Sequence, residues 1–554
     1  MESWRRGIVP AWSALLAIAV GLPWFRGGYL LSYDMVWVPH LDLDRADLWG
    51  LGSALPRAVP SDAVVAVLGA VVDPAVVQRA VLLLALVAAG VGAGRLVAGL
   101  GLLPQLVAAT FALWNPYVAE RLVMGHWPLL IGYAALFWLV DGVQHERWGA
   151  VAVALVATSL TPVNGLMGLV VLVVVSRRFV LPVVAATVVN APWIVASLVN
   201  RGAVAPDSGG IEAFAIQPEG PLGRVGAALS LGGIWNTEAV PTSRDLPIAT
   251  VITALLWLVA VVGAVRMRRS RTTGSGALLV LGVVGLLLST VGWWAGGVME
   301  AAVEVLGPVA LLRDGTRWLA LLAVPLVVAL AHGTRALLDR WDGTGLQAVP
   351  LLVVLLPVAA LPDLALGVDG RVTPVTYPAD WDRARAAVSS VDVPGDLLAL
   401  PFTIYRQPGW NEGRKVLDPA GRYFDRTTLT DDRLEVGDSE VAGEDPRAVE
   451  VRALLADGAR PGELAAAGIG VVVVDVSAPG GTEALASVED LEPVLVDGDL
   501  RVFSDPGAVR IEPSTARRVV LAATWIAWAV VLVASLVAPW WRGRPKGRHD
   551  APRA

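Results

Sequence analysis

The sequence predicts an all-α polytopic membrane bundle of about 12 transmembrane helices, with a C-terminal extracytoplasmic α/β domain and one last transmembrane helix after it. Two observations lead to this fold class. Of the 554 residues, 55% are hydrophobic and only 17% are charged, whereas about a quarter of the residues of a soluble globular protein are charged. In addition, apolar runs of about 20 residues, long enough to cross the hydrocarbon core of a bilayer, recur along the chain.

The number of spans depends on four short apolar segments in the N-terminal half. If Thr161–Gly165 makes an external turn, every arginine cluster lies in the cytoplasm, as the positive-inside rule requires. A single span over 149–176 would instead place the cluster around Arg268 outside, so we predict about 12 spans with both termini cytoplasmic. The long candidates lie near 8–25, 75–99, 178–199, 248–265, 277–296, 317–334, 347–366 and 517–540, and the short ones near 104–118, 127–140, 149–162 and 164–176.

Arginine clusters mark the predicted cytoplasmic ends. They are Arg5-Arg6, Arg147, Arg177-Arg178, Arg266 to Arg271, Arg335 with Arg340, and the tail from Arg542 to Arg553. The first apolar segment follows Arg6 and has no small-residue cleavage site, so we predict that it is retained as a helix. The chain is therefore expected to be a multi-pass protein of the plasma membrane.

Four regions are predicted: a transmembrane domain (1–366), an extracytoplasmic α/β domain (367–515), a final transmembrane helix (516–541) and a basic cytoplasmic tail (542–554). In the second region, apolar β-branched runs predict strands, and Asp497-Gly498 predicts a hairpin turn. The expected strands are 396–402, 468–476, 492–496 and 499–503, the expected helices are 380–391, 446–457 and 461–467, and 405–435 is expected to be an ordered loop.

Several function classes are excluded by residues that the sequence lacks. There is no cysteine, which excludes disulfides, thiolate metal sites and a cysteine nucleophile. No P-loop, dinucleotide fingerprint, zinc-protease motif or nucleophile elbow occurs, which argues against an ATP-driven pump. The α/β domain has no basic stripe, so we expect no nucleic acid as a partner.

The long first external loop, residues 26–74, is rich in carboxylates. Asp34 follows the first helix closely, and Asp42 and Asp44 come soon after it. Such a carboxylate can act as a general base on a sugar hydroxyl or ligate a divalent cation; alternatively, the acids only solvate the loop. Asp34 is the strongest candidate, because an unpaired charge between Tyr33 and the apolar residues that follow is unfavourable without a purpose.

Two further segments bring charged side chains to the outer surface. Glu120, Arg121 and His126 fall in one tight external turn, as the wall of a polar cavity or as interfacial anchors. Arg313 and Arg317 are four residues apart before a strong helix, where two guanidiniums suit a phosphate or pyrophosphate. Unspecific binding of lipid headgroups is the alternative for this pair.

The segment Tyr405–Arg414 interleaves aromatic with amide and charged side chains. Such a mixture suits sugar rings, and it equally suits packing onto the loops of the membrane domain. We favour packing.

The layout, together with the stretches NPYVAERLVMGHWPLLIGYA, LLRDGTRWLAL and LPFTIYRQPGWNEGRKVLDP, resembles the GT-C glycosyltransferase superfamily and uncharacterised actinobacterial membrane proteins grouped near it. The resemblance implies a polyprenyl-phosphate-linked sugar as donor, inversion at the anomeric carbon and a cell-envelope polysaccharide as acceptor. It implies Asp34 as the catalytic carboxylate. The two adjacent acids common in the family are absent, because Asp34 stands beside Tyr33 and the pair Asp42/Asp44 lies further on.

The leading hypothesis from the sequence is therefore a membrane glycosyltransferase. Asp34 would be its base, assisted by Asp42 or Asp44, and Arg313 and Arg317 would hold the phosphate of the donor. Membrane lipids are also expected as partners. A divalent cation, Mg²⁺ or Mn²⁺, is compatible with this site and is not required by it. The alternatives are a transporter or flippase for a lipid-linked saccharide and a non-catalytic envelope-assembly protein.

Overall fold

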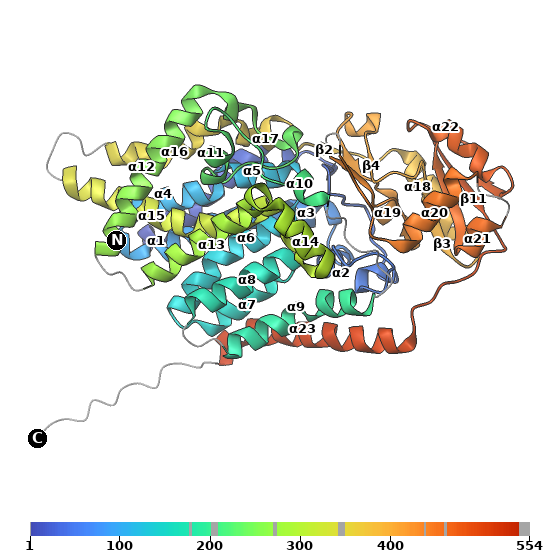
Figure 1. Cartoon of the computed structure of the whole chain (residues 1–554), viewed down its shortest axis with the longest axis horizontal. Coiled ribbons are helices and arrows are strands. Elements are labelled where there is room, and N and C mark those ends of the chain that lie inside the picture. The colour runs from blue at the N-terminus through green and yellow to red at the C-terminus, as the bar shows by residue number, and fades with distance from the viewer. Residues whose placement is uncertain are drawn as a thin grey trace, which may run out of the picture.

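The computed structural model describes residues 2–176, 180–200, 209–269, 274–341, 349–436, 439–458 and 462–541. A bundle of helices fills one part of the molecule, and an α/β unit stands at one end of it (Figure 1). The predicted arginine clusters at 177–178 and 542–553, and Arg271, lie outside the described residues.

Within the described ranges, eight helices are long and apolar enough to cross a membrane. A bent pair, Pro350–Ala360 and Pro362–Asp369, makes a ninth span if its two parts, which meet at 66°, are counted together. The predicted bundle is confirmed, whereas the number of 12 spans is not. The eight are α1 (Glu2–Gly21), α3 (Pro74–Leu96), α6 (Trp127–Gln144), α9 (Val180–Val199), α12 (Pro247–Arg269), α13 (Ser275–Trp294), α15 (Leu319–Trp341) and α23 (Thr515–Trp541).

The remaining helices of the bundle are shorter. The segment predicted as a span at 104–118 is broken at Asn115, and the bent pair corresponds to α16 and α17. These helices are α2 (Ser61–Gly69), α4 (Leu102–Leu113), α5 (Pro116–Val123), α7 (Trp148–Thr158), α8 (Pro162–Val175), α10 (Gly210–Ala213), α11 (Gly223–Leu229), α14 (Gly296–Val305), α16 (Val349–Ala360) and α17 (Ala365–Asp369).

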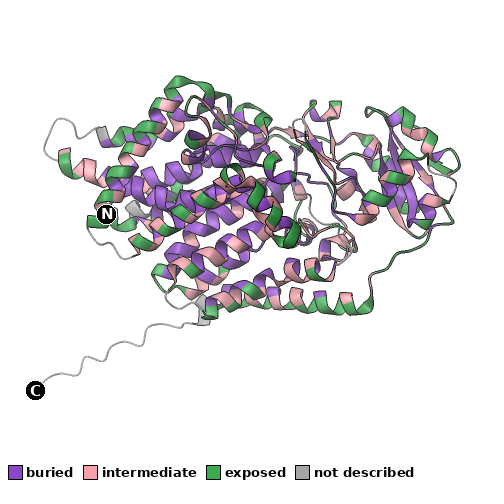
Figure 2. Cartoon of the chain, viewed as in Figure 1, coloured by how far each residue is buried: buried purple, intermediate pink, exposed green. Residues whose placement is uncertain are grey.

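The outer helices of the bundle are apolar on the side that faces away from the protein. Leu258 of α12 is 62% exposed and Ile526 of α23 is 65% exposed, and Figure 2 shows exposed residues along the whole of α23. A surface of this kind is unfavourable in water, and lipid solvates it directly. The chain is a multi-pass membrane protein.

Basic side chains gather where several helices end. Arg95 at the end of α3 and Arg147 after α6 both pair with Asp141, at 3.5 and 3.0 Å. Arg266 of α12 pairs with Asp339 of α15 at 2.7 Å. The start of α1 and the end of α23 lie at this same end of the bundle, opposite the α/β unit (Figure 1).

The α/β unit is built on a five-stranded sheet in the order β10-β11-β9-β3-β6. Strand β3 (Asp396–Leu400) is parallel to β6 (Thr428–Leu429) and to β9 (Ile469–Asp475), and the hairpin of β10 (Glu492–Leu495) and β11 (Leu500–Ser504) adds antiparallel strands. Every residue of β9 is buried, as expected for a strand covered on both faces.

Helices cover the two faces of this sheet. Trp381 of α18 (Ala379–Ser390) packs with Val471 on one face, and Val451 of α20 (Pro446–Ala456) packs with Val472 on the other. The predicted strands and the first two predicted helices are confirmed within a few residues, and the third is reduced to α21 (Glu463–Ala466). Short elements also occupy the region predicted as a loop: β4 (Tyr405–Arg406), β5 (Val416–Leu417), α19 (Ala420–Tyr423), β6 and the first strand of the hairpin β7 (Leu434–Val436)–β8 (Ser439–Val441). The unit also contains α22 (Gly481–Ala484).

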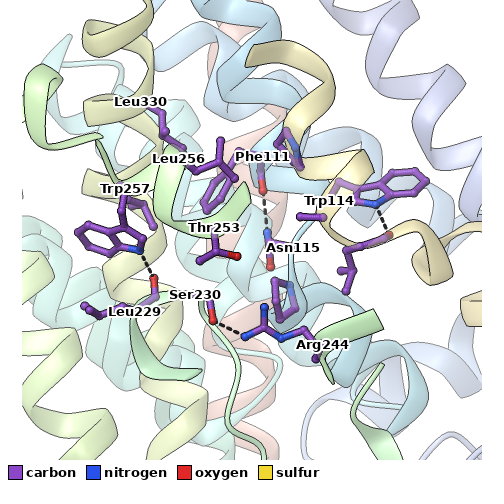
Figure 3. A pocket seen from close by; sticks show the side chains of 15 residues that line it. Phe111, Trp114, Asn115, Leu229, Ser230, Arg244, Thr253, Leu256, Trp257 and Leu330 are labelled. Atoms are coloured by element: carbon purple, nitrogen blue, oxygen red, sulfur yellow. Dashed lines mark hydrogen bonds between the residues drawn. The ribbon is translucent and has the colours of Figure 1, made fainter. Parts of the chain in front are cut away.

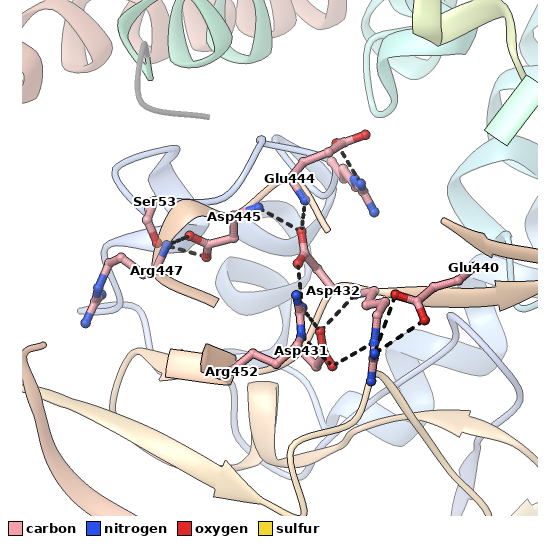
Figure 4. Close-up of polar contacts among 10 residues, drawn as sticks. Ser53, Asp431, Asp432, Glu440, Glu444, Asp445, Arg447 and Arg452 are labelled. Atoms are coloured by element: carbon pink, nitrogen blue, oxygen red, sulfur yellow. Dashed lines mark hydrogen bonds and ion pairs between the residues drawn. The ribbon is translucent and has the colours of Figure 1, made fainter. Parts of the chain in front are cut away.

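The first loop packs against this α/β unit. Strand β1 (Tyr29–Leu30) pairs with β2 (Pro374–Val375), and Val36 and Leu41 share one hydrophobic core with Trp381. Figure 4 shows polar contacts at this boundary, where Ser53 reaches Asp445 at 2.9 Å. The α/β unit and the first loop are thus packed together through a shared core at one end of the bundle.

Candidate active site

Helix α5 organises the end of the bundle that faces the α/β unit. Asn115 follows the end of α4 and caps α5, because its side chain accepts a 3.1 Å hydrogen bond from the backbone N–H of Val118. Pro116 follows at the first helical position, where its missing N–H and fixed φ favour helix initiation. The helix ends at Val123, so that Glu120, Arg121 and His126 come from one short element and its exit turn.

Gly125 lets the first loop approach this turn closely. Its φ is +72°, and a Cβ at this position would collide with the backbone of Ser32 and Met35. The N–H of Asp34 donates to the carbonyl of Met124 at 3.1 Å. Tyr33 has a φ of 43°, a strained conformation for a bulky residue that often accompanies function.

We expect Gly125→Ala to displace the first loop. Gly413 is a matched control, since its φ is +69° but a Cβ there would meet nothing within 4 Å. Both alanines incur the left-handed backbone strain, and only the one at position 125 adds a collision. The melting temperature in detergent should fall clearly more for Gly125→Ala than for Gly413→Ala, and equal falls would contradict this docking.

Asp34 accepts hydrogen bonds on both of its carboxylate oxygens. His126 Nε2 lies 3.1 Å from Oδ2, and the hydroxyl of Tyr405, from β4 of the α/β unit, lies 2.5 Å from Oδ1. The side chain of Asp34 is nevertheless 41% exposed. The carboxylate is therefore held in a fixed orientation while part of it stays accessible to a ligand.

The tautomer of His126 follows from its second partner. Arg121 Nη1 lies 3.2 Å from His126 Nδ1, and a guanidinium can only donate, so Nδ1 accepts. Burial lowers the pKa of His126, which favours the neutral ring with its proton on Nε2. His126 therefore donates to Asp34.

Arg121 is fully buried and joins this histidine to the start of α15. Its Nη2 donates to the hydroxyl of Thr316 at 2.5 Å, and Thr316 donates to Asp314 at 2.8 Å. Arg317 Nε also donates to Asp314, at 2.7 Å. Burial opposes the charge of Asp314, but Arg317 and Arg121 outweigh it and lower its pKa to about 2.

Opposing influences also act on Asp34. Burial is the largest influence and raises its pKa, but the contact with His126, the hydrogen bond from Tyr405 and the positive charge of Arg317 together outweigh it, so that the pKa lies below its ordinary value. Asp34 is therefore ionised at neutral pH and stands near a guanidinium.

The two predicted phosphate-binding arginines point to different partners. Arg317 pairs with Asp314 within its own turn, whereas Arg313 pairs with Glu444 of the α/β unit at 3.1 Å. Arg57 of the first loop pairs with the same carboxylate at 2.7 Å. Glu444 is held in place because its N–H donates to Asp432 at 2.6 Å (Figure 4).

Asp42 and Asp44 lie in a separate turn of the first loop. Asp42 accepts a 3.1 Å hydrogen bond from the N–H of Asp44, whose side chain is exposed. Neither is among the residues that line the cavity beside Asp34. The structure does not bring them together with Asp34.

The surroundings of Asp34 do not fit a divalent cation. Both of its oxygens accept hydrogen bonds, and the charge that acts on it from Arg317 is positive. Among the described residues, no group of three acidic or histidine side chains is placed to hold a metal ion.

Glu120 lies beside the buried pair of Glu219 and Arg244, which are 3.1 Å apart. Burial, with the neighbouring Glu219, raises the pKa of Glu120 well above its ordinary value. Glu120, Arg121 and His126 are all buried, and none of the three lines either of the two cavities described here. These three side chains are thus more deeply buried than the partly exposed carboxylate of Asp34.

Two cavities lie at opposite ends of α5. One is small and mostly apolar and is lined by Asn115 and Pro116 together with residues of α4, α11, α12, α15 and α16, with Arg244 and Ser230 at one side (Figure 3). The other, also small, is lined by Asp34 and Trp127 among others. Eight residues lie between Asn115 and Met124, so the two are nine helical steps or roughly 13 Å apart at 1.5 Å per residue.

Reasoning from the sequence missed Tyr405, which contacts Asp34, and Glu444, which contacts Arg313; Arg57 joins the site only through Glu444. Tyr405 lay in a segment whose aromatic and charged residues were assigned to packing. The segment does pack on the first loop, because the N–H of Tyr33 donates to the carbonyl of Lys415 at 2.8 Å. Asp34 has no charged or polar partner next to it in the sequence except Tyr33, which was a signal that a hydrogen-bond donor from elsewhere in the chain had to reach it.

The fold and this cluster define a multispanning membrane protein with an extramembrane α/β unit that reaches a carboxylate at the end of its bundle. No protein-family profile and no curated protein sequence matches the chain. Among solved structures, the chain is similar to a cryo-EM structure of the arabinofuranosyltransferase AftD from mycobacteria, with 18% identity and a TM-score of 0.54.

The likeness extends over most of this chain and less than half of the other. It covers 92% of this chain and 42% of the AftD chain. At this identity it establishes the fold. The multispanning fold that the predicted resemblance implies is thereby confirmed.

Proposed function

We propose that the chain is a GT-C-type membrane glycosyltransferase that moves a sugar from a polyprenyl-phosphate donor to a cell-envelope glycan. The observation that carries the proposal is the carboxylate of Asp34. It is ionised, held by donors on both oxygens, partly exposed and close to Arg317. A carboxylate held in this way is suited to accept a proton from an attacking hydroxyl.

In this mechanism an acceptor hydroxyl attacks the anomeric carbon of the donor sugar. The new bond forms between the hydroxyl oxygen and that carbon, and the bond from the carbon to the phosphate oxygen breaks. Asp34 takes the proton of the hydroxyl, and the phosphate leaves with the bonding electrons. Attack from the face opposite the phosphate inverts the anomeric centre, and Arg317 stabilises the charge that develops on the phosphate.

Arg317 is the better placed of the two arginines for the phosphate. It lies near enough to Asp34 to lower its pKa, and the hydroxyl of Tyr117 fixes its backbone carbonyl at 3.2 Å. Arg313 is already paired with Glu444. We assign Arg313 to the contact between the bundle and the α/β unit, so that it affects binding of the donor only indirectly.

The apolar cavity supports a lipid-linked donor. Its walls are Phe111, Leu256, Trp257 and Leu330 among others (Figure 3), a lining that accepts hydrocarbon and not a nucleotide. Pro116 on its wall is the neighbour of Tyr117, which contacts Arg317. The apolar lining therefore lies next to the segment that contacts Arg317, and we propose it as the side from which the isoprenoid of the donor approaches.

The orientation in the membrane follows from charge. The arginine-rich ends of the helices lie opposite the α/β unit, and basic ends face the cytoplasm. On this proposal both termini are cytoplasmic and residues 367–515 are extracytoplasmic. The partners are the lipid-linked sugar, membrane lipids and the envelope glycan.

The direct test uses the purified full chain in lipid nanodiscs. Polyprenyl-phosphate pentoses and hexoses carrying a radiolabel are offered together with neutral oligosaccharides. We expect label in the oligosaccharide from at least one donor, with an inverted linkage. If the chain in vesicles moves labelled lipid across the membrane without any covalent product, it is a flippase. If neither transfer nor lipid movement occurs, an assembly protein is supported.

Tyr405→Phe should move the acid limb of the pH–rate profile. Loss of this donor raises the pKa of Asp34, because the hydrogen bond from Tyr405 stabilises the ionised form. The ionised base is then lost at a higher pH, so the limb of kcat/KM shifts upward. Tyr33→Phe is the control, since its hydroxyl donates to Glu238 and not to Asp34; an unmoved limb in Tyr405→Phe would argue against Asp34 as base.

A further inference from the structure

The carboxyl ends of β3 and β9 lie side by side in the five-stranded sheet. The two strands are parallel, with Leu400 opposite Val474, and β6 lies on the other side of β3. The chain therefore runs from β3 to β6 and then crosses to β9, which makes a topological switch point between β3 and β9. Open α/β sheets commonly bind their ligands beyond the carboxyl ends of the strands at such a point.

In this chain the switch point is occupied by Arg406 of β4. Its Nη2 donates to the carbonyl of Pro401, directly after β3, at 3.0 Å, and its Nη1 lies 3.8 Å from Asp475, the last residue of β9. Its Nε donates at 2.8 Å to Asp418, which follows β5. The side chain of Arg406 is only 6% exposed. The guanidinium thus ties the ends of two sheet strands to the ribbon formed by β4 and β5.

This ribbon also carries the contact to Asp34. Successive side chains of a strand point to opposite faces, so Arg406 points into the sheet while Tyr405, beside it in β4, reaches Asp34. Strand β4 lies on the side of the α/β unit nearest the bundle (Figure 1). Strand β5 pairs with β4 and also with the first loop, since the N–H of Leu417 donates to the carbonyl of Tyr33 at 2.8 Å. The carboxylate and its hydroxyl partner are therefore attached to the same short strand.

We propose that Arg406 is a positioning residue, which fixes the hydroxyl of Tyr405 on the carboxylate of Asp34 by anchoring β4 to the sheet. This inference rests on the proposed function, in which Asp34 is the base. Strands β4 and β5 have two residues each, and a two-stranded ribbon is marginally stable by itself. A buried guanidinium adds a strong restraint, because moving it away from its carboxylates leaves buried charges without partners.

A comparison of single and double variants separates positioning from a purely structural role. His126 and Arg317 act on Asp34 from the bundle, whereas Tyr405 acts on it from the α/β unit. A change at Arg406 therefore reaches Asp34 through Tyr405, and losing that hydrogen bond raises the pKa of the carboxyl group. The readout is the acid limb of kcat/KM for sugar transfer by the full chain in nanodiscs.

We expect Arg406→Met to move this limb upward by about one pH unit, as for one lost hydrogen bond to a charged group. In a chain that already carries Tyr405→Phe, the same substitution should add no further shift, because the two residues act as one unit. Arg406→Lys keeps a charge for Asp418 and should move the limb by a smaller amount. Additive shifts of Arg406→Met and Tyr405→Phe contradict the proposal.

Arg385→Met is the matched control. Arg385 of α18 belongs to the same unit and donates to Asp425 at 2.8 and 2.7 Å. Its removal also costs the unit an ion pair with two hydrogen bonds. We expect its acid limb to coincide with that of the original chain, whatever the change in the unfolding midpoint.

The second readout needs no catalysis. The chain has seven tyrosines, and with carbon-13 at their Cζ atoms the NMR signal of Tyr405 is the one missing from Tyr405→Phe. In the original chain this signal should change with pH as Asp34 gains its proton. In Arg406→Met that change should disappear, and in Arg406→Lys it should weaken.

An unmoved limb and an unchanged Tyr405 signal in the Arg406 variants overturn the positioning role, while transfer itself can stand. If Arg406→Met does not fold, Arg406→Lys decides by the same two measurements. Absence of transfer with every donor overturns the proposed function, and the signal of Tyr405 still tests the role of Arg406.

Discussion

Asp34→Asn is expected to lower sugar transfer by about 10²- to 10⁴-fold, the usual contribution of a general base. Asparagine keeps the shape of the side chain and can still accept from His126 Nε2, but it cannot take the proton of the acceptor hydroxyl. The KM for the donor should change little, because Arg317 is left in place. Transfer is measured at saturating donor and acceptor.

Asp44→Asn is the control for this substitution. Asp44 lies in the same loop, is exposed, and does not line the cavity beside Asp34. We expect its activity to match that of the original chain. Full activity of Asp34→Asn would remove the proposed reaction, whatever the state of the other carboxylates.

Arg121→Met is expected to destabilise the folded chain by about 3–5 kcal/mol, the range found when one partner of a buried charge pair is removed. Arg121 is 0% exposed and contacts Thr316, His126 and Asp314. Methionine has similar bulk but cannot donate, so buried polar atoms lose their partner. The readout is the midpoint of thermal unfolding in detergent.

The matched control is Arg383→Met. Arg383 pairs with Asp380 at 2.5 Å, but its side chain is 56% exposed, and surface pairs of this kind contribute little. We expect an unfolding midpoint close to that of the original chain. A similar midpoint for Arg121→Met would mean that water or a rearranged side chain satisfies the buried groups.

Elements whose signals are local could be predicted from the sequence. The run GIGVVVVDV is apolar and β-branched, and it forms β9; Asp497-Gly498 joins the strands of the last hairpin. Helix α5 was missed, although Asn-Pro is a strong helix-start signal. The segment from Asn115 to Trp127 was expected to be an external turn between two short helices, and most of it forms α5.

The candidate site could be predicted only in part. Asp34 was chosen because an unpaired charge is unfavourable beside apolar residues. Glu120, Arg121 and His126 were chosen because they fall in one tight turn, and Arg317 because of its spacing from Arg313 before a helix. The five residues lie in or beside one network of polar contacts. Contacts such as that of Arg313 with Glu444 join residues 131 positions apart. No local pattern encodes such a pair, since the fold as a whole brings its members together.

The contact between Tyr405 and Asp34 links residues 371 positions apart, and this sets an order of events during synthesis. At roughly 5–20 residues per second, the carboxylate waits about 20 to 75 s for its hydroxyl partner. Until that segment has been synthesised, the carboxylate of Asp34 lacks one of its two hydrogen-bond donors. The cluster around Asp34 is therefore completed only late in synthesis.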